Sequence, residues 1–179
     1  MLERFYPREY MDSAYSIPYE EYYRSGMRGV IFDIDNTLVM HGAPADDRAI
    51  RLFRRLRSMG MKTCLLSNNK ERRVKPFAGA VGSAYICRAG KPAVRGYRAA
   101  MEKMGTDAAS TLFVGDQLFT DVYGANRAGI YGILTRPINP REEIQIVLKR
   151  RLEAIVLFFY RRRAAKDKRD GQMRGGEKR

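Results

Sequence analysis

The chain has 179 residues, 45% of them apolar, which suits one packed domain and excludes a disordered or collagen-like chain. Its 34 basic and 20 acidic residues give a net charge of +14, so we expect a polyanionic partner: nucleic acid, anionic lipid or a phosphorylated substrate. Two cysteines exclude a disulfide framework, and the longest apolar run, seven residues at Ala154–Tyr160, is too short to cross a bilayer.

Residues 1–28 are predicted to form an N-terminal arm that is rich in tyrosine. Six of the eleven tyrosines lie in it, at positions 6, 10, 15, 19, 22 and 23. Tyrosine suits a half-buried position in a protein and also the interface of a lipid bilayer. We favour packing of these rings against the body of the protein and keep the lipid interface as the alternative.

Residues 29–140 alternate short apolar runs with segments of helical periodicity. The runs are almost continuously apolar, as expected of strands buried on both faces. The predicted strands are Gly29–Phe32, Lys62–Leu66, Ala84–Cys87, Thr111–Val114 and Gly132–Thr135, and the predicted helices are Asp46–Met59, Ala93–Met104 and Phe119–Ala128. This alternation predicts the α/β class: a doubly wound parallel sheet with helices on both faces.

Residues 141–170 are predicted to contain a basic amphipathic helix. Over Glu142–Tyr160, helical spacing places five apolar side chains on one face: Ile144, Leu148, Leu152, Ile155 and Phe159. Residues 149–179 hold 12 basic and 4 acidic side chains, so much of the positive charge lies at this end. The final residues, 171–179, are rich in glycine and charge and are expected to be disordered.

Polar side chains follow four of the predicted strands at the point where each strand ends. In chain order they are Asp33, Asp35 and Thr37, then Ser67 and Asn68, then Lys91, and finally Asp116 and Asp121. Ligands of open parallel sheets bind beyond the carboxyl ends of the strands. We therefore expect these side chains to converge at one edge of the sheet.

The type, order and strand context of these residues match a known set of motifs. They read Asp-Ile-Asp-Asn-Thr from Asp33, Ser-Asn-Asn from Ser67, Gly-Lys-Pro from Gly90 and Gly-Asp-Gln-Leu-Phe-Thr-Asp from Gly115. From about Gly29 to Thr135 the chain resembles the haloacid dehalogenase superfamily of phosphohydrolases, and its spacing is similar to the YqeG-type, phosphatidylglycerophosphate phosphatase branch. The resemblance implies a Rossmann-like fold and says little about residues after Pro140.

Phosphoryl transfer by itself assigns roles to these residues. It needs an in-line nucleophile, positive charge around the equatorial oxygens and a proton for the leaving group. Asp33 suits a nucleophile that forms an aspartyl-phosphate, and Asp35 suits the acid that protonates the leaving oxygen and then activates water. Lys91 is expected to offset the charge on Asp33 and to hold phosphoryl oxygens together with Ser67. Thr37 and Asn68 are expected to help through hydrogen bonds.

The same edge of the sheet is predicted to hold Mg²⁺. This ion prefers oxygen ligands in an octahedron and keeps several waters. Asp33, the backbone carbonyl of Asp35 and Asp116 are the predicted metal ligands, and Asp121 is either a further ligand or a partner behind them.

Each of these residues also has a structural interpretation. An isolated Asp, Ser or Asn after a strand is commonly a helix cap or a turn residue, and a lysine before proline is commonly solvated. The agreement of four successive strand ends favours the catalytic interpretation. The single histidine, His41, is expected at the surface without a catalytic role.

The gaps between the motifs leave no room for a cap domain. There are 29 residues between Thr37 and Ser67 and 23 between Ser67 and Lys91, enough in each case for one helix and one strand. A site without a cap accepts a large substrate or borrows a lid from another subunit. The substrate is therefore expected to be a lipid headgroup, a nucleic-acid end or a phosphoprotein.

The site residues thus favour a Mg²⁺-dependent phosphatase. The resemblance to the phosphatidylglycerophosphate phosphatase branch implies phosphatidylglycerophosphate as its substrate, and the missing cap and the basic tail agree with a lipid. The basic helix would lie on the anionic surface of the inner face of the cell membrane, although packing of that helix on the sheet is an equal alternative. The scarcity of cysteine and the absence of a signal-peptide core favour a cytoplasmic protein. Two alternatives remain: a phosphatase for a nucleic-acid end or soluble phosphoester, and a non-enzymatic RNA- or ribosome-associated module.

Overall fold

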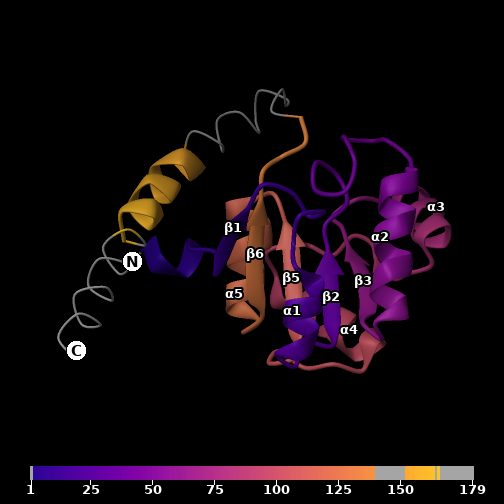
Figure 1. Cartoon of the computed structure of the whole chain (residues 1–179). Coiled ribbons are helices and arrows are strands. Elements are labelled where there is room, and N and C mark those ends of the chain that lie inside the picture. Colours follow the sequence, from indigo (N-terminus) through magenta and orange to yellow (C-terminus); the bar gives the residue numbers. More distant parts are fainter. Residues whose placement is uncertain (1, 140–151, 164, 166–179) are drawn as a thin grey trace.

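One parallel sheet of six strands forms the centre of the molecule (Figure 1). The computed structural model describes residues 2–139, 152–163 and 165. The strands are β1 (Glu9–Met11), β2 (Gly29–Phe32), β3 (Lys62–Leu66), β4 (Ala84–Ile86), β5 (Thr111–Gly115) and β6 (Tyr131–Thr135). The α-helices within residues 2–139 are α1 (Tyr19–Arg24), α2 (Asp47–Ser58), α3 (Glu71–Val81), α4 (Val94–Met104) and α5 (Tyr123–Arg127).

The strand order β1-β6-β5-β2-β3-β4 places a reversal of winding at the centre of the sheet. From β2 the chain winds outward through α2 to β3 and through α3 to β4. It then crosses back through α4 to β5, on the other side of β2, and continues through α5 to β6. The loops after β2 and β5 therefore diverge from neighbouring strands, and such a point is where open α/β sheets bind ligands.

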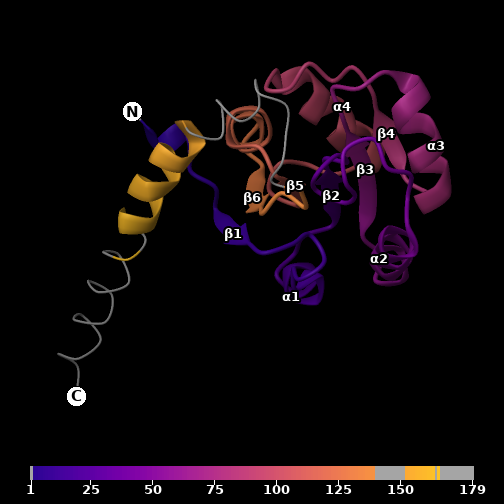
Figure 2. The ribbon, with the colours of Figure 1, turned by 90° about the horizontal axis from the view of Figure 1, so that it is seen from above.

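Helices cover both faces of the sheet (Figure 2). Successive side chains of a strand point to opposite faces, so Val30 and Phe32 belong to one core and Ile31 to the other. The first core includes Phe53 of α2 and Tyr19 of α1, and the second includes side chains of α4 and α5. The predicted fold class is confirmed. Between β2 and β4 the chain contains α2 and α3 and no cap domain.

The predicted strands agree with the structure to within one residue at each end. The sequence pattern did not delimit helix α3. This helix carries Pro76 in its interior, and proline weakens a helical pattern. The helix predicted at Phe119–Ala128 is two elements: a π-helical turn at Leu118–Val122 and then α5. π-Helical turns are frequent at functional sites, and this one carries Asp121.

The N-terminal arm is part of the fold. Its strand β1 pairs in parallel with β6 at the edge of the sheet, and Tyr19 is fully buried against Phe32, with ring centroids 6.1 Å apart. Glu9 accepts hydrogen bonds from the hydroxyls of Tyr22, at 2.6 Å, and Tyr131, at 2.5 Å. The rings at positions 19 and 22 thus pack against the body and do not form an exposed belt.

The helix at residues 152–163 packs through one face against the π-helical turn, β6 and the arm. Val156 is buried with Leu118 and Leu134, and the carboxylate of Glu153 accepts a hydrogen bond from the Leu118 backbone N–H at 2.8 Å. Leu152, Ile155 and Phe159, which share the predicted apolar face, are instead exposed. Ile144, Leu148 and residues 171–179 lie outside the described residues. Among the described residues, no helix has the length and hydrophobicity to span a membrane.

Replacing Tyr19 by phenylalanine tests how the arm is anchored. The Tyr19 hydroxyl donates to the Ala14 carbonyl at 2.8 Å in a buried position, so Tyr19→Phe leaves that carbonyl without its partner. We expect a loss of about 1–2 kcal/mol in the free energy of unfolding, measured by urea denaturation. Tyr23→Phe is the matched control and is expected to change it by less than about 0.5 kcal/mol. Equal effects of the two variants would contradict this account of the arm.

Candidate active site

The polar residues predicted at the four strand ends come together around one pocket at the carboxyl edge of β2, β3 and β5. The pocket has a volume of about 110 Å³. It is lined by Asp33, Asp35, Asn36, His41, Ser67, Asn68, Asn69, Lys91, Gln117 and Thr120. Asp116, Asp121 and Thr37 are buried behind it. All eight predicted site residues therefore lie in or directly behind this pocket.

A buried lysine joins two of the aspartates. The Lys91 ammonium lies 2.6 Å from Asp33 Oδ1 and 2.7 Å from Asp121 Oδ1, and all three side chains are at least nine-tenths buried. Burial by itself lowers the pKa of Lys91, but the charges of Asp121 and Asp33 outweigh it and raise that pKa above its usual value. Lys91 is therefore a permanent cation beside Asp33.

For the Asp33 carboxyl, burial outweighs the neighbouring charge of Lys91. Burial raises its pKa, the charge of Lys91 lowers it, and the charge of Asp121 raises it again, leaving a pKa of about 7. The single Lys91 ammonium thus does not offset the desolvation and mutual repulsion of the buried carboxylates. A further cation near Asp33 would stabilise its ionised form and lower its pKa.

The acidic side chains have the arrangement of a metal site. Asp33, Asp116 and Asp121 are buried and each offers a carboxylate oxygen, and these oxygens lie within 4.8 Å of one another. Thr37 donates a hydrogen bond to Asp116 Oδ1 at 3.1 Å, which orients that carboxylate. Three hard oxygen donors, with the charge imbalance at Asp33, fit Mg²⁺.

Asp35 faces a different set of partners. Its Oδ1 accepts hydrogen bonds from the Gly42 backbone N–H and from Arg73 Nη2, both at 2.8 Å, and its Oδ2 accepts one from Asn69 Nδ2 at 2.6 Å. The sequence reasoning missed Arg73 and gave Asn69 no role. The sequence does place Arg73 in the first turn of the helix that follows Ser67, close to the predicted site, and this position could have indicated it.

Ser67 and Asn68 have distinct structural roles. The Ser67 hydroxyl is buried and accepts a hydrogen bond from the Asn69 backbone N–H at 3.1 Å. Asn68 accepts a hydrogen bond from the Lys91 backbone N–H at 2.7 Å and donates one to the Lys91 carbonyl at 3.3 Å. The side chain of Asn68 therefore holds the loop that delivers Lys91.

A π-helical turn sets the position of Asp121. The backbone N–H groups of Asp121 and Val122 both donate to the Gln117 carbonyl, at 2.9 and 3.2 Å. Asp121 Oδ2 in turn accepts a hydrogen bond from the Gln117 N–H at 3.1 Å. The carboxylate consequently caps its own turn with one oxygen and binds Lys91 with the other.

The loop after Asp35 brings His41 to the rim of the pocket. His41 is exposed, as predicted, but it lines the opening together with Gln117 and Thr120. The sequence reasoning gave these two polar residues no role. Because the Gly42 N–H is bound to Asp35, the loop that carries His41 is held at the site.

A buried lysine among carboxylates at the switch point of a doubly wound sheet suits phosphoryl transfer, and the family comparison identifies the class as a hydrolase. Residues 43–129 match the model of the haloacid dehalogenase-like hydrolases. The chain is 34% identical over 165 residues to a Bacillus subtilis protein named "Probable phosphatase YqeG", covering 91% of this chain and 96% of that one. The chain therefore belongs to the haloacid dehalogenase-like hydrolases, in agreement with the resemblance found in its motifs.

Other relatives extend this comparison. The chain is 31% identical over 169 residues to phosphatidylglycerophosphate phosphatase 1, chloroplastic/mitochondrial, of Arabidopsis thaliana, covering 84% of this chain but only 46% of that protein. A solved HAD phosphatase from Thermococcus onnurineus has a TM-score of 0.50 and 18% identity, covering 66% of this chain and 90% of that one. An uncharacterized protein from Listeria monocytogenes serotype 4b has a TM-score of 0.51 and 17% identity, covering 66% and 86%.

The family match and the two named phosphatases identify the chain as a phosphoric monoester hydrolase, which acts on a phosphorylated substrate. The predicted enzyme class is confirmed. The two solved structures, at under 25% identity, bear on the fold alone.

Gly115→Ala tests the placement of Asp121. A Cβ atom on Gly115 would lie 2.5 Å from Asp121 Oδ2, so the carboxylate must move away from Lys91. We expect phosphatase activity to fall by about 100-fold in a folded protein, because displacements of about 1 Å at a catalytic group have effects of that size. Gly79→Ala in α3, where nothing lies within 4 Å of an added Cβ, is the control and should keep full activity. Full activity of Gly115→Ala would contradict this role of Asp121.

Proposed function

We propose that this phosphatase removes the terminal phosphate of phosphatidylglycerophosphate at an anionic membrane surface, with Mg²⁺ as its cofactor. The observation that carries the reaction type is the contact of Asp33 with Lys91 beside two further buried aspartates. A carboxylate at a strand tip, with a fixed cation at 2.6 Å, suits attack on a phosphorus atom.

In this proposal the side chains of the pocket share the two steps of the reaction. Asp33 attacks the phosphorus in line and forms an aspartyl-phosphate, while Asp35 donates a proton to the departing glycerol oxygen. Asp35 then takes a proton from water, which hydrolyses the aspartyl-phosphate and regenerates Asp33. Lys91 and Ser67 hold the phosphoryl oxygens, and Arg73 is proposed to orient the Asp35 carboxylate between its two tasks.

Asp33, Asp116 and Asp121 are the side chains proposed to hold Mg²⁺, with the backbone carbonyl of Asp35 as a further ligand. Bound there, the ion would neutralise charge on the phosphoryl oxygens. Thr37 keeps Asp116 turned toward the site through its hydrogen bond. Asn68 acts on the phosphate indirectly, because it fixes the backbone of Lys91.

The size of the catalytic pocket supports a large substrate. A volume of about 110 Å³ is well below the roughly 300–1,000 Å³ of pockets that enclose a whole ligand. Only the phosphoryl group would enter, and the remainder of the substrate would stay outside. The relative named for phosphatidylglycerophosphate further supports a lipid, although the chain spans about half of that protein.

The C-terminal region is the proposed membrane contact at the inner face of the cell membrane. In our division of the chain, residues 1–28 are the arm, 29–140 the catalytic domain, 141–170 the membrane-contacting segment and 171–179 a tail. Within the described part of that segment, four large apolar side chains are exposed: Leu152, Ile155, Phe158 and Phe159. Arg161 and Arg162 follow them and are also exposed, a pattern typical of helices in a headgroup plane.

Phosphate release from a substrate panel tests the proposed substrate. The panel contains phosphatidylglycerophosphate in mixed micelles, a terminally phosphorylated oligonucleotide and glycerol 3-phosphate. We expect kcat/KM for the lipid to exceed the others by at least about tenfold, and Asp33→Asn to lower it by more than about a thousandfold. Asp47→Asn, at the exposed start of α2, is the matched control. Preference for the oligonucleotide, or turnover by Asp33→Asn, would refute the lipid substrate or the covalent step respectively.

The affinity for Mg²⁺ is expected to depend on pH. Since the pKa of Asp33 is raised to about 7, its carboxyl carries a proton below that pH and must lose it to bind a metal. Binding should therefore be tightest above pH 7 and weaken below it, by up to about tenfold per pH unit for one proton. Calorimetric titration with MgCl₂ at a series of pH values measures this. An affinity independent of pH across this range would show that Asp33 is not a ligand.

A further inference from the structure

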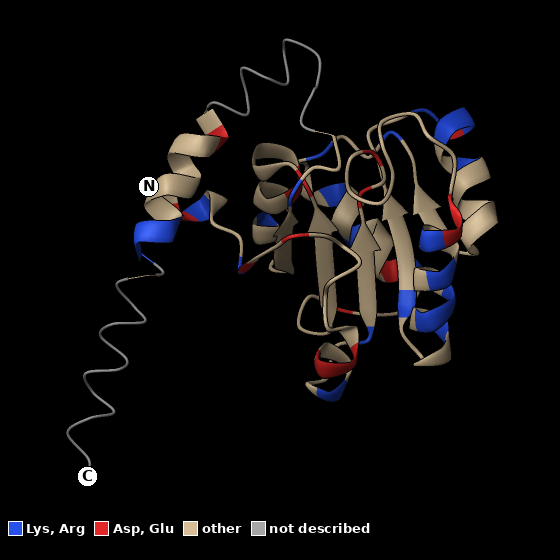
Figure 3. Cartoon of the chain, turned by 45° about the horizontal axis from the view of Figure 1, so that its top comes forward, with Lys and Arg blue, Asp and Glu red and all other residues tan. Residues whose placement is uncertain are grey.

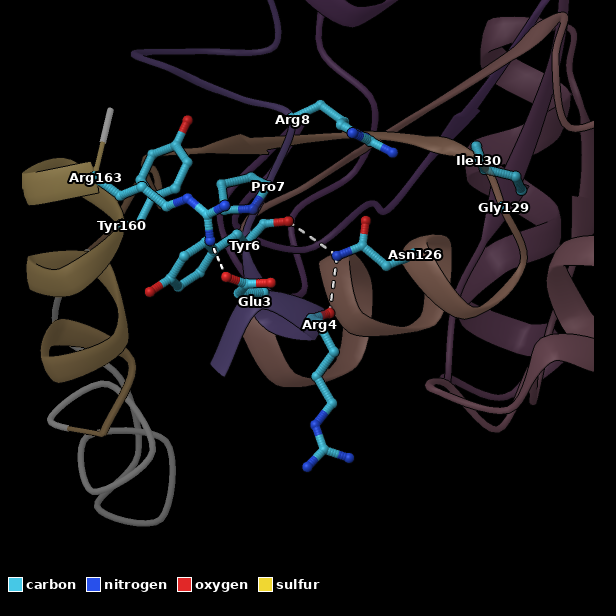
Figure 4. Close-up of a pocket in the computed structure, with 10 residues that line it drawn as sticks. All are labelled: Glu3, Arg4, Tyr6, Pro7, Arg8, Asn126, Gly129, Ile130, Tyr160 and Arg163. Atoms are coloured by element: carbon cyan, nitrogen blue, oxygen red, sulfur yellow. Dashed lines mark hydrogen bonds and ion pairs between the residues drawn. The ribbon is translucent and has the colours of Figure 1, made fainter. Parts of the chain in front are cut away.

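A second cavity lies between the N-terminal arm, α5 and helix 152–163 (Figure 4). We call it the arm pocket. Its volume is about 620 Å³, within the range of ligand-binding pockets and several times that of the catalytic pocket. None of its lining residues belongs to the catalytic pocket. The arm pocket is therefore separate from the catalytic pocket and large enough to hold a ligand of its own.

Arginine side chains dominate the charge of the arm pocket. Arg4 and Arg8 come from the arm and Arg163 comes from helix 152–163. Glu3 is the acidic side chain in the lining, and it forms an ion pair with Arg163. The Arg4 side chain points away from the other two arginines (Figure 4), so Arg8 and the Arg163–Glu3 pair leave an excess of one positive charge at the cavity. Guanidinium groups bind phosphate oxygens through paired N–H donors, so the charge suits a phosphate-bearing ligand.

The remaining walls of the arm pocket combine apolar bodies with polar edges. The rings of Tyr6 and Tyr160 meet edge to face, with centroids 5.5 Å apart. Asn126 Nδ2 donates to the carbonyls of Arg4 and Tyr6, both at 2.9 Å, and so fixes the arm against α5. Tyr6 and Tyr160 are half-buried, and half-buried tyrosine is typical of the boundary between water and lipid.

An exposed apolar strip leads to the arm pocket. The strip consists of Leu152, Ile155, Phe158 and Phe159, whose side chains are 45–55% exposed. Leu152, Ile155 and Phe159 follow the i, i+3, i+7 spacing of one helix face, and Arg163 is four residues beyond Phe159 on the same face. Arg163 therefore connects the strip to the basic lining of the arm pocket.

We propose that the arm pocket binds the phosphate headgroup of an anionic phospholipid that is not the substrate, while the apolar strip enters the bilayer beside it. Arg8 and Ile130 directly precede β1 and β6, so the arm pocket lies at the amino edge of the sheet, and a headgroup bound there would hold the enzyme on the membrane without blocking the catalytic pocket at the carboxyl edge. This inference rests on the proposed lipid substrate, which gives the enzyme a reason to reside on a bilayer.

Charge and hydrophobicity together favour a phospholipid as the occupant. A second copy of this chain carries a net charge of +14 and would be repelled. A soluble phosphate ester would use the guanidinium groups but would leave the strip in water. Basic residues are also concentrated in α2 (Figure 3), but none of the large apolar side chains exposed among the described residues belongs to that helix. The arm pocket thus offers basic side chains for the phosphate of a phospholipid, and the adjacent strip offers an apolar surface for the bilayer.

Vesicle binding by the full chain tests the proposal. The vesicles contain phosphatidylcholine alone, or phosphatidylcholine with about one-third phosphatidylglycerol, which has no phosphomonoester to hydrolyse. The pocket variant is Arg8→Gln/Arg163→Gln, and Arg51→Gln/Arg54→Gln on the exposed face of α2 is the control with the same change in net charge. The strip variant is Ile155→Ser/Phe159→Ser. Thermal unfolding checks that each variant is folded, and glycerol 3-phosphate is added as a soluble competitor.

We expect the pocket variant to bind anionic vesicles about 30-fold more weakly, since each basic residue near such a surface contributes about 1 kcal/mol. The α2 control should change binding by less than about threefold, and the strip variant should lose binding as the pocket variant does. Equal weakening by the two arginine pairs would overturn the proposal in favour of net charge alone. Unchanged binding by the strip variant, with full competition by glycerol 3-phosphate, would overturn it in favour of a soluble ligand.

The outcome is separable from that of the proposed function. Turnover of phosphatidylglycerophosphate by the wild type, with vesicle binding that the pocket variant retains, refutes the arm pocket and leaves the substrate assignment intact. Pocket-dependent vesicle binding, with no phosphate release from that lipid, supports the arm pocket and refutes the substrate.

Discussion

The buried ammonium of Lys91, lying between the carboxylates of Asp33 and Asp121, is the interaction on which the site depends. Removing charged groups from water is expensive, and a buried pair persists only where each charge has its partners in place. Removal of one partner from such a group typically costs about 3–5 kcal/mol, because the other charge is left uncompensated. The surrounding structure therefore has to hold all three side chains at once.

Three separate parts of the fold meet that requirement. The Asp33 backbone N–H donates to the Val114 carbonyl, so Asp33, the proposed nucleophile, is fixed by the pairing of β2 with β5. Asn68 binds both backbone polar groups of Lys91 and places the lysine from the end of β3. The π-helical turn after β5 directs Asp121 inward. Because these parts belong to a packed sheet, the site is rigid before any substrate arrives.

The N-terminal arm and helix 152–163 add a further surface at the β6 edge of the sheet. The arm adds β1 to the sheet edge beside β6, and helix 152–163 rests on the arm through Val156, Glu153 and an edge-to-face pair of tyrosine rings. Packing of this helix and its proposed contact with a membrane are not exclusive alternatives, because different side chains serve them: Val156 and Glu153 are buried, whereas Ile155 and Phe159 are exposed. The catalytic pocket remains small and open, consistent with a substrate that is itself anchored elsewhere.

Sequence alone was sufficient where one physical rule applies locally. Strands buried on both faces are nearly continuously apolar, so β2, and β3 apart from its first residues Lys62 and Thr63, could be found from the sequence pattern. Parallel strands end at one edge, so the convergence of Asp33, Ser67, Lys91 and Asp116 could be predicted from their positions after strands. Recognition of the motifs added the family, and the spacing of the motifs excluded a cap.

Other features depended on contacts between distant segments. Strand β1, at Glu9–Met11, is too short and mixed to be found by pattern, and it exists because β6 offers an unpaired edge. Arg73 reaches Asp35 only because α3 returns across the end of β3. Periodicity predicted an apolar face on the last helix but not which face would be buried. Val156 packs because the arm and the π-helical turn present a matching apolar surface to it, whereas Ile155 and Phe159 meet none among the described residues.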